Sequence, residues 1–247
     1  MTRLSLMLGA LLVVVGTAAS KAGGEDGRQA SGVAAEATEL GKLEAVLAER
    51  PDDLRAGSEY RMAVIKAKAY DRCLKFFEQL VTKHPYAAYA HLNYGLAYVD
   101  KVPDAGAVTQ LVLANSALTE FNKAAELRPN VITYYLRGAD YVYWPKVFNR
   151  APQGIEDLEN ARNLARSGRK RSYYVYIYIA LGDGYWKMDN LPKARAIWKE
   201  GLTPFPDDAD LKARLSKEGD DLKEFIYDSR DPTRRFDTSL REAWGDQ

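Results

Sequence analysis

The amino-acid sequence predicts an all-α fold built from repeated helix pairs, and three observations lead to that expectation. From Glu36 almost to the end of the chain, apolar residues recur at helical spacing. Prolines, glycines and clusters of Asp or Asn interrupt this pattern, and Pro51 and Pro85 do so 34 residues apart. A fixed period of that length is typical of helical repeats. No stretch alternates apolar and polar residues for long enough to predict a β-strand.

Composition and charge narrow the function before any motif is considered. The 247 residues are 47% hydrophobic, which is ample for a folded core. The 35 basic and 34 acidic side chains nearly cancel, so no net field would draw the protein to nucleic acid or to an anionic membrane. The single cysteine, Cys73, excludes a framework of intramolecular disulfides. We expect Cys73 to be a small buried core residue.

Residues 1–22 have the pattern of a signal peptide. Arg3 supplies a positive charge, Leu4–Val15 form an apolar run, and small residues follow at Gly16–Ser20. This run is too short for a bilayer-spanning helix, which needs about 20 apolar residues. We therefore expect cleavage, a periplasmic or secreted protein, and no stable membrane insertion afterwards. Residues 23–35 are rich in Gly, Ala and charge and are predicted to be a flexible linker.

The best repeat spans Val175–Asp208. Its large and small residues fall at fixed offsets: Tyr178, Leu181, Gly182, Tyr185, Ala194, Trp198, Gly201 and Pro206. Asn190 can cap the second helix of this repeat, and Pro192 is tolerated in its first turn. The pattern resembles the tetratricopeptide-repeat (TPR) family. The resemblance implies a right-handed α-solenoid of about four helix pairs, with a leading and a trailing capping helix.

Weaker versions of the pattern precede the best repeat. The second repeat has an insertion at residues 100–110 and carries Tyr94, Gly95, Tyr98, Ala117, Phe121, Ala124 and Pro129. The third has an insertion at residues 144–152 and carries Tyr134, Gly138, Tyr141, Gly154, Leu158 and Ala161. The first, Leu54–Tyr86, is degenerate, because Arg61 stands where the family prefers Gly. Cys73 takes a small-residue position in that repeat, which favours a packing role.

The repeat register also decides the secondary structure of ambiguous segments. Tyr173–Leu181 is rich in strand-forming residues, but its place in the best repeat predicts a helix. The repeat domain is predicted to span residues 36–228. A leading helix is expected at Glu36–Arg50 and a trailing helix at Asp210–Tyr227, since terminal repeats must cover the last apolar face. The charged tail, residues 229–247, is expected to be loosely attached, although some of its apolar residues recur at helical spacing: Phe236, Leu240 and Trp244.

Evidence for catalysis is thin. The chain has two histidines, His84 and His91, and its sequence contains no phosphate-binding loop, nucleophile elbow or metalloprotease motif. We therefore predict no enzyme activity, no cofactor and no metal site. A basic cluster follows the third repeat and comprises Arg162, Arg166, Arg169, Lys170 and Arg171. It could hold an anionic partner, but a solvated turn is the more common explanation for such a cluster.

In TPR arrays the first helix of each repeat lines a concave groove. Carried over to this sequence, that family geometry gives Tyr89, Leu92, Leu96 and Val99 from the second repeat, Ile132, Tyr135, Ala139, Val142 and Tyr143 from the third, and Tyr176, Ile179, Asp183, Trp186 and Lys187 from the fourth. This mostly apolar set disfavours the clamp of Lys, Asn and Arg with which some members hold a partner's terminal carboxylate. A large apolar surface favours a partner. The groove could equally be filled by the protein's own chain, through the second-repeat insertion or the tail.

Two functional hypotheses follow from the resemblance. The first is an extracytoplasmic scaffold or adaptor that binds a protein or peptide partner, with large apolar anchors supplying the affinity. The second is a small-molecule-binding helper protein of an envelope transport system. An open groove across several repeats would favour the first hypothesis, and a closed cavity lined by Tyr and Trp would favour the second.

Overall fold

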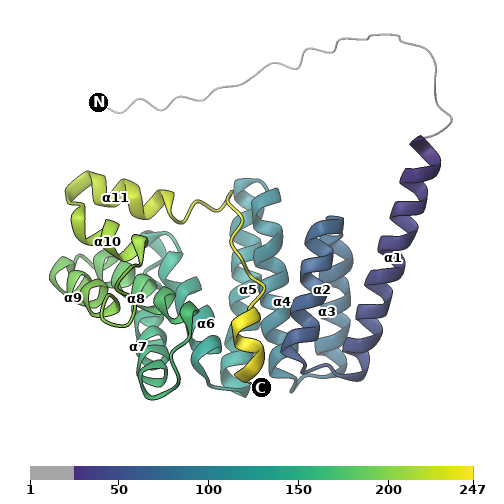
Figure 1. The fold of residues 1–247 in the computed structure, drawn as a ribbon, viewed down its shortest axis with the longest axis horizontal. Coiled ribbons are helices and arrows are strands. Elements are labelled where there is room, and N and C mark those ends of the chain that lie inside the picture. The colour runs from purple at the N-terminus through teal and green to yellow at the C-terminus, as the bar shows by residue number, and fades with distance from the viewer. Residues whose placement is uncertain (1–24, 247) are drawn as a thin grey trace, which may run out of the picture. The chain divides into compact units, whose positions relative to one another are not determined.

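The computed structural model describes residues 25–246, and its regular structure within that range is helical, without a strand (Figure 1). The chain divides into two compact units, Met1–Thr38 and Glu39–Gln247, and the second contains the predicted repeats. The predicted signal peptide, residues 1–22, lies outside the described residues.

Four helix pairs follow one another along the second unit. They are α2 (Leu54–Ala67) with α3 (Tyr70–Lys83), α4 (Ala88–Lys101) with α5 (Ala107–Leu127), α6 (Val131–Tyr143) with α7 (Ala151–Ser167), and α8 (Val175–Lys187) with α9 (Leu191–Gly201). Helix α1 (Glu25–Glu49) precedes them, and α10 (Ala209–Ser216) and α11 (Gly219–Asp228) follow. The two helices of a pair pack on each other, and each pair packs on the next, so the predicted all-α solenoid of about four helix pairs is confirmed.

The fourth pair shows how local residues produce the repeat. The Asn190 side chain accepts a hydrogen bond from the Lys193 main-chain N–H at 3.1 Å and so caps α9, with Pro192 in its first turn as predicted. At the crossing of the two helices, a Cβ added to Gly182 would lie 2.1 Å from Nε1 of Trp198. Only glycine permits so close an approach, and the fully buried Trp198 ring fills the space that results.

The strand-forming run Tyr173–Leu181 is helical, as the repeat register predicts. One 3-10 turn, Ser172–Tyr174, leads directly into α8 at Val175. Ile177, Ile179 and Leu181 are fully buried in the core of the fourth repeat. Burial on both sides of this helix outweighs the intrinsic β-preference of its residues, because tertiary packing routinely overrides propensity.

Two helix boundaries differ from the sequence prediction. Helix α1 begins at Glu25, inside the segment predicted as a linker, where Glu, Arg, Gln and Ala are all strong helix formers. The single trailing helix predicted at Asp210–Tyr227 is wrong, since it is two helices, α10 and α11. The break falls at Lys217–Glu218, and Gly219 has a φ of +52°, a left-handed conformation that favours glycine.

Cys73 lies on α3 and is 2% exposed, in the same core cluster as Tyr60 and Phe77. Burial raises the pKa of its thiol well above the ordinary range. Both features confirm the predicted packing role in the first repeat and disfavour thiolate chemistry.

We expect Gly182→Ala to lower the free energy of unfolding by about 1–3 kcal/mol in denaturant titration. The clash with the immobile Trp198 ring should outweigh the roughly 1 kcal/mol gained in helix propensity. Gly41→Ala is the control, because Gly41 also lies inside a helix and a Cβ there meets only the end of the Arg72 side chain, at 3.8 Å. It should leave stability unchanged or raise it by up to about 1 kcal/mol. Equal stability of the two variants would contradict the close approach of α8 and α9.

Candidate functional site

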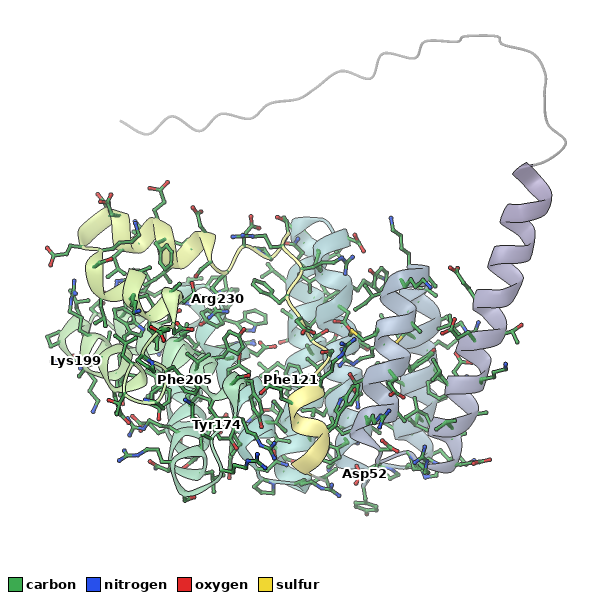
Figure 2. The ribbon with its side chains drawn as sticks, in the orientation of Figure 1. Asp52, Phe121, Tyr174, Lys199, Phe205 and Arg230 are labelled. Atoms are coloured by element: carbon green, nitrogen blue, oxygen red, sulfur yellow. The ribbon has the colours of Figure 1, made fainter. Side chains whose placement is uncertain are left out.

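The side chains predicted to line the groove come from α4, α6 and α8. Together with α2, these helices form one surface of the second unit, here called the A-helix face. The C-terminal tail covers the α2–α4 end of this face, and α10 and α11 cover the α8 end (Figures 1 and 2). A patch between these two covers is left partly exposed.

The covered α2–α4 end contains the groove residues predicted from the second repeat. Tyr89, Leu92 and Leu96 are buried in one cluster with Ala243 of the tail. Trp244 and other tail residues pack against the same cluster. The predicted groove residues of α4 therefore lie beneath the protein's own chain, and the tail is the segment that fills this end.

Arg61 of α2 is the centre of the tail's attachment. Its buried Nη1 lies 2.7 Å from Oδ2 of Asp100, and its Nε donates to Oδ1 of Asn93 at 3.0 Å. Its Nη2 donates to the main-chain oxygen of Thr238 at 2.6 Å, and the Thr238 hydroxyl donates to Oδ1 of Asp100 at 2.5 Å. A buried guanidinium without acceptors is strongly unfavourable. The tail supplies part of the acceptor set that makes burial of Arg61 tolerable.

Two further contacts hold the tail on either side. The Ser58 hydroxyl donates to the main-chain oxygen of Ser239. Farther along, Glu242 accepts a hydrogen bond from the main-chain N–H of Ser172 at 3.1 Å. The prediction of a loosely attached tail is therefore wrong. Its polar groups meet fixed donors and acceptors of the repeats, while its apolar residues join the core.

Helices α10 and α11 cover the α8 end of the A-helix face. Ile179 is fully buried in the cluster that includes Leu211 of α10. Asp183 is buried beside it and accepts hydrogen bonds from Nε and Nη2 of Arg214, at 2.7 and 3.0 Å. The Tyr143 hydroxyl donates to the same carboxylate at 3.0 Å. Two of the predicted groove residues of α8, Ile179 and Asp183, thus lie beneath the chain's own helices.

Four aromatic side chains remain partly exposed between the two covers and are called the central patch: Tyr135, Tyr143, Tyr176 and Trp186. Tyr176 is 45% exposed. The ring of Trp186 meets Tyr227 of α11 edge-on, with centroids 6.0 Å apart. Arg230, at the end of α11 (Figure 2), places its guanidinium 4.5 Å from the centroid of the Tyr143 ring. The structure thus brings together four aromatic residues predicted to line the groove, and it places Arg230 beside them.

Comparison with solved structures decides what this arrangement of helices is. TTC0263, a thermophilic TPR protein of Thermus thermophilus, is 22% identical with a TM-score of 0.51, over 78% of this chain and 94% of its own. YrrB, described as a TPR protein with an unusual peptide-binding site, is 16% identical with a TM-score of 0.50, over 83% of this chain and 92% of its own. The chain has the TPR fold. No protein-family profile and no curated protein matches the sequence.

The insertion in the third TPR repeat, residues 144–152, is held by its own stack of rings and charge. Trp144 and Phe148 meet edge-on at 5.2 Å, and the Arg150 guanidinium lies 3.7 Å from the centroid of Trp144. Trp144 Nε1 donates to Oδ1 of Asp140 at 2.8 Å. Burial raises the pKa of Asp140 to about 7, and the Trp144 hydrogen bond and Arg150 oppose that rise.

The basic cluster mainly joins α7 to the fourth TPR pair. Arg162 and Arg166 lie 3.1 and 3.4 Å from the carboxylate of Glu200. Lys170 lies over the Phe205 ring at 4.8 Å from its centroid. These charges therefore have partners within the fold and support packing between repeats.

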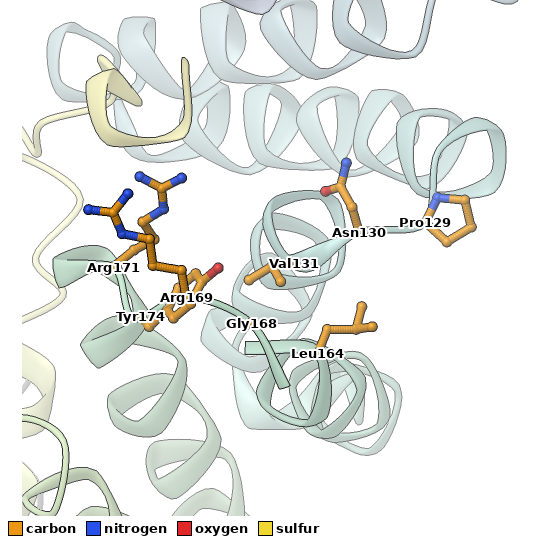
Figure 3. A pocket seen from close by; sticks show the side chains of 8 residues that line it. All are labelled: Pro129, Asn130, Val131, Leu164, Gly168, Arg169, Arg171 and Tyr174. Atoms are coloured by element: carbon orange, nitrogen blue, oxygen red, sulfur yellow. The ribbon is translucent and has the colours of Figure 1, made fainter. Parts of the chain in front are cut away.

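The two remaining cluster residues, Arg169 and Arg171, line a hollow of about 350 Å³ (Figure 3). Asn130 and Tyr174 also line it. The Asn130 side-chain oxygen already caps α6 by accepting from the main chain. This hollow includes none of the central-patch residues.

Neither metal binding nor a membrane span finds support in the residues that the structure describes. No three His, Cys, Asp or Glu side chains in that part of the chain converge as a metal site. His91 is instead engaged with Glu120 at 2.6 Å. Within residues 25–246 no helix combines the length and the apolar character needed to cross a bilayer.

Neither Arg61 nor Arg230 is predicted from the sequence to determine which part of the TPR face is covered. Arg61 leaves a usable signal, because a long cation stands where the repeat prefers Gly. Arg230 leaves none, since only the three-dimensional path of the chain after α11 brings it to Tyr143.

We expect Arg61→Met to lower the free energy of unfolding by about 3–5 kcal/mol, because it leaves the Asp100 carboxylate buried without its cation. Arg166→Met is the matched control, since it breaks a largely exposed ion pair and should cost less than about 1 kcal/mol. Urea titrations compare the two variants. The tail of Arg61→Met should also become the first site of proteolysis, and an unchanged cleavage pattern would contradict the anchor.

A second expectation concerns Asp140. The native state keeps a proton that the unfolded state releases near its ordinary pKa, so this carboxyl makes the unfolding free energy fall as pH rises from about 4 to about 7. Asp140→Asn keeps an oxygen acceptor for Trp144 and cannot ionise. Its stability relative to wild type should therefore increase between about pH 5 and about pH 8 in urea titrations. The exposed Asp71→Asn is the control, and a constant difference for Asp140→Asn would refute the expectation.

Proposed function

We propose that this protein is an extracytoplasmic TPR scaffold or adaptor that binds a protein or peptide partner through the central patch. The observation that carries the proposal is the partial exposure of Tyr135, Tyr143, Tyr176 and Trp186 while both neighbouring parts of the same face are covered. Clustered aromatic side chains that keep contact with solvent are typical anchors of protein interfaces.

The tail supports the idea that this face suits polypeptide. At the α2–α4 end the face already holds a non-helical segment of the chain, whose Thr238 and Ser239 main-chain oxygens accept from Arg61 and Ser58. The same kind of contact is available to a partner at the central patch. YrrB is described as a TPR protein with an unusual peptide-binding site, which agrees with a polypeptide-binding role for this fold.

The extracytoplasmic setting rests on the signal-peptide pattern of residues 1–22. The alternative, a small-molecule-binding helper of an envelope transport system, calls for a closed aromatic cavity. The hollow of about 350 Å³ beside Asn130 has a mixed lining that includes two arginines, and another of about 440 Å³ beside Phe148 is lined largely by polar and charged residues. Neither includes a central-patch residue, so the scaffold is the better-supported function.

The test is recovery of partners by the tagged protein from extracts of its own cells, with identification by mass spectrometry. Tyr176→Ala should weaken binding of a recovered partner by about 1–3 kcal/mol, with little loss of stability because this side chain is 45% exposed. Tyr86→Ala is the control, since Tyr86 is 82% exposed in the loop between α3 and α4. Equal partner recovery by both variants would count against the central patch. An amino terminus that still begins at Met1 would count against export.

A further inference from the structure

Arg230, beside the central patch, has a guanidinium without a hydrogen-bond acceptor among the described residues. The Arg230 guanidinium lies over the Tyr143 ring, 4.5 Å from its centroid. Its Nε is buried, so Nη1 and Nη2 are the atoms that a bound group can reach. Buried donors are almost always paired, because an unpaired one loses its hydration without compensation. The guanidinium of Arg230 therefore has room for an acceptor from outside the described residues.

Asp183 attracts Arg230 electrostatically, but its hydrogen bonds go to two other residues. Asp183 accepts from Arg214 at 2.7 and 3.0 Å and from the Tyr143 hydroxyl at 3.0 Å. Lys187, which also feels the charge of Asp183, donates to main-chain oxygens. Asp210 lies 3.9 Å from Arg214 and is about half exposed. Three cations thus surround one buried carboxylate, which leaves an excess of positive charge at this place.

One neutral donor, the Tyr135 hydroxyl, lies in the surroundings of Arg230, and a second, Tyr176, neighbours Tyr135. Tyr135 of α6 and Tyr176 of α8 are electrostatic neighbours of each other, and Arg230 is a neighbour of Tyr135. Burial raises the pKa of Tyr135, and Arg230 opposes that rise. Neither hydroxyl makes a hydrogen bond within the part of the chain that the structure describes. Arg230 therefore has the Tyr143 ring against it and Tyr135 in its electrostatic surroundings, and Tyr176 borders Tyr135.

We propose that Arg230, with the hydroxyls of Tyr135 and Tyr176, forms a carboxylate-binding site that takes an Asp or Glu side chain of the bound polypeptide. The inference rests on the proposed function and specifies its partner. A guanidinium offers a planar fork that matches the two oxygens of a carboxylate. The aromatic surroundings exclude water and favour apolar residues next to the acid. A partner with a neutral side chain at this position would leave Arg230 unpaired.

The test begins with a library of random peptides, displayed with their carboxyl ends fused so that only side-chain carboxylates are offered. Selection on the full chain should enrich peptides with an acid at one fixed position among apolar residues. A selected peptide and its counterpart with Gln or Asn in place of the acid are then titrated by calorimetry. Wild type should prefer the acidic peptide by about 10- to 100-fold.

Arg230→Gln should abolish that preference. Arg234→Gln removes the same charge from an exposed neighbour that donates to the main-chain oxygen of Asp228, and it should keep the preference. If Arg230→Gln does not fold, the pair Tyr135→Phe and Tyr176→Phe keeps both rings, removes both hydroxyls and should reduce the preference.

The outcomes separate the inference from the function on which it rests. Selected peptides without a fixed acid, or a preference that survives in Arg230→Gln, would overturn the carboxylate site and leave the scaffold function standing. Failure to enrich any peptide would overturn the proposed function, and the carboxylate site with it. Loss of the preference in Arg230→Gln alone supports both.

Discussion

The burial of one guanidinium determines how this repeat array is closed. Arg61 stands where a TPR helix prefers glycine, and its charge lies in the interior between α2 and α4. Asp100 and Asn93 provide acceptors from α4, but the last acceptor, the main-chain oxygen of Thr238, comes from the end of the chain. A buried cation with incomplete pairing is costly. The tail therefore stabilises Arg61, Arg61 positions the tail, and the apolar residues of α4 become core because the tail lies over them.

The attachment of the tail through Arg61 divides the A-helix face into a covered part and an exposed part. At the opposite end a second buried pair, Asp183 with Arg214, joins α8 to α10 and draws Ile179 into the core beneath the last helices. The two pairs act alike, since each places an arginine against a buried carboxylate and so fixes a terminal segment on the A-helix face. The stretch between them keeps the four aromatic side chains of the central patch in contact with solvent. The availability of this face is thus set by the two terminal segments, which the charge pairs and the apolar contacts hold in place.

Sequence reasoning succeeds here wherever structure follows from local pattern and repeat register. The offsets around Gly182 and Trp198 predict the fourth pair, including the helix from Val175 that local propensity would make a strand. It fails where distant segments meet. Nothing near the tail announces that its polar groups have partners on α2, since Arg61 and Thr238 are 177 positions apart. Likewise, the list of groove residues is a set of positions on helices, and burial by the tail or by α10 and α11 cannot be read from those positions.

Arg61, Arg214 and Arg230 all need acceptors for guanidinium groups that are largely withdrawn from water. They have such acceptors to different degrees. Arg61 and Arg214 each have a carboxylate within hydrogen-bonding distance and further oxygen acceptors around it. Arg230 has the face of Tyr143 and the long-range attraction of Asp183, but its guanidinium has no hydrogen-bond acceptor among the described residues. A cation–π contact offsets part of the loss of hydration and does not replace a hydrogen bond. The repeats thus complete two of these sites from within the chain, and the third has the form of a site whose acceptor arrives with a partner.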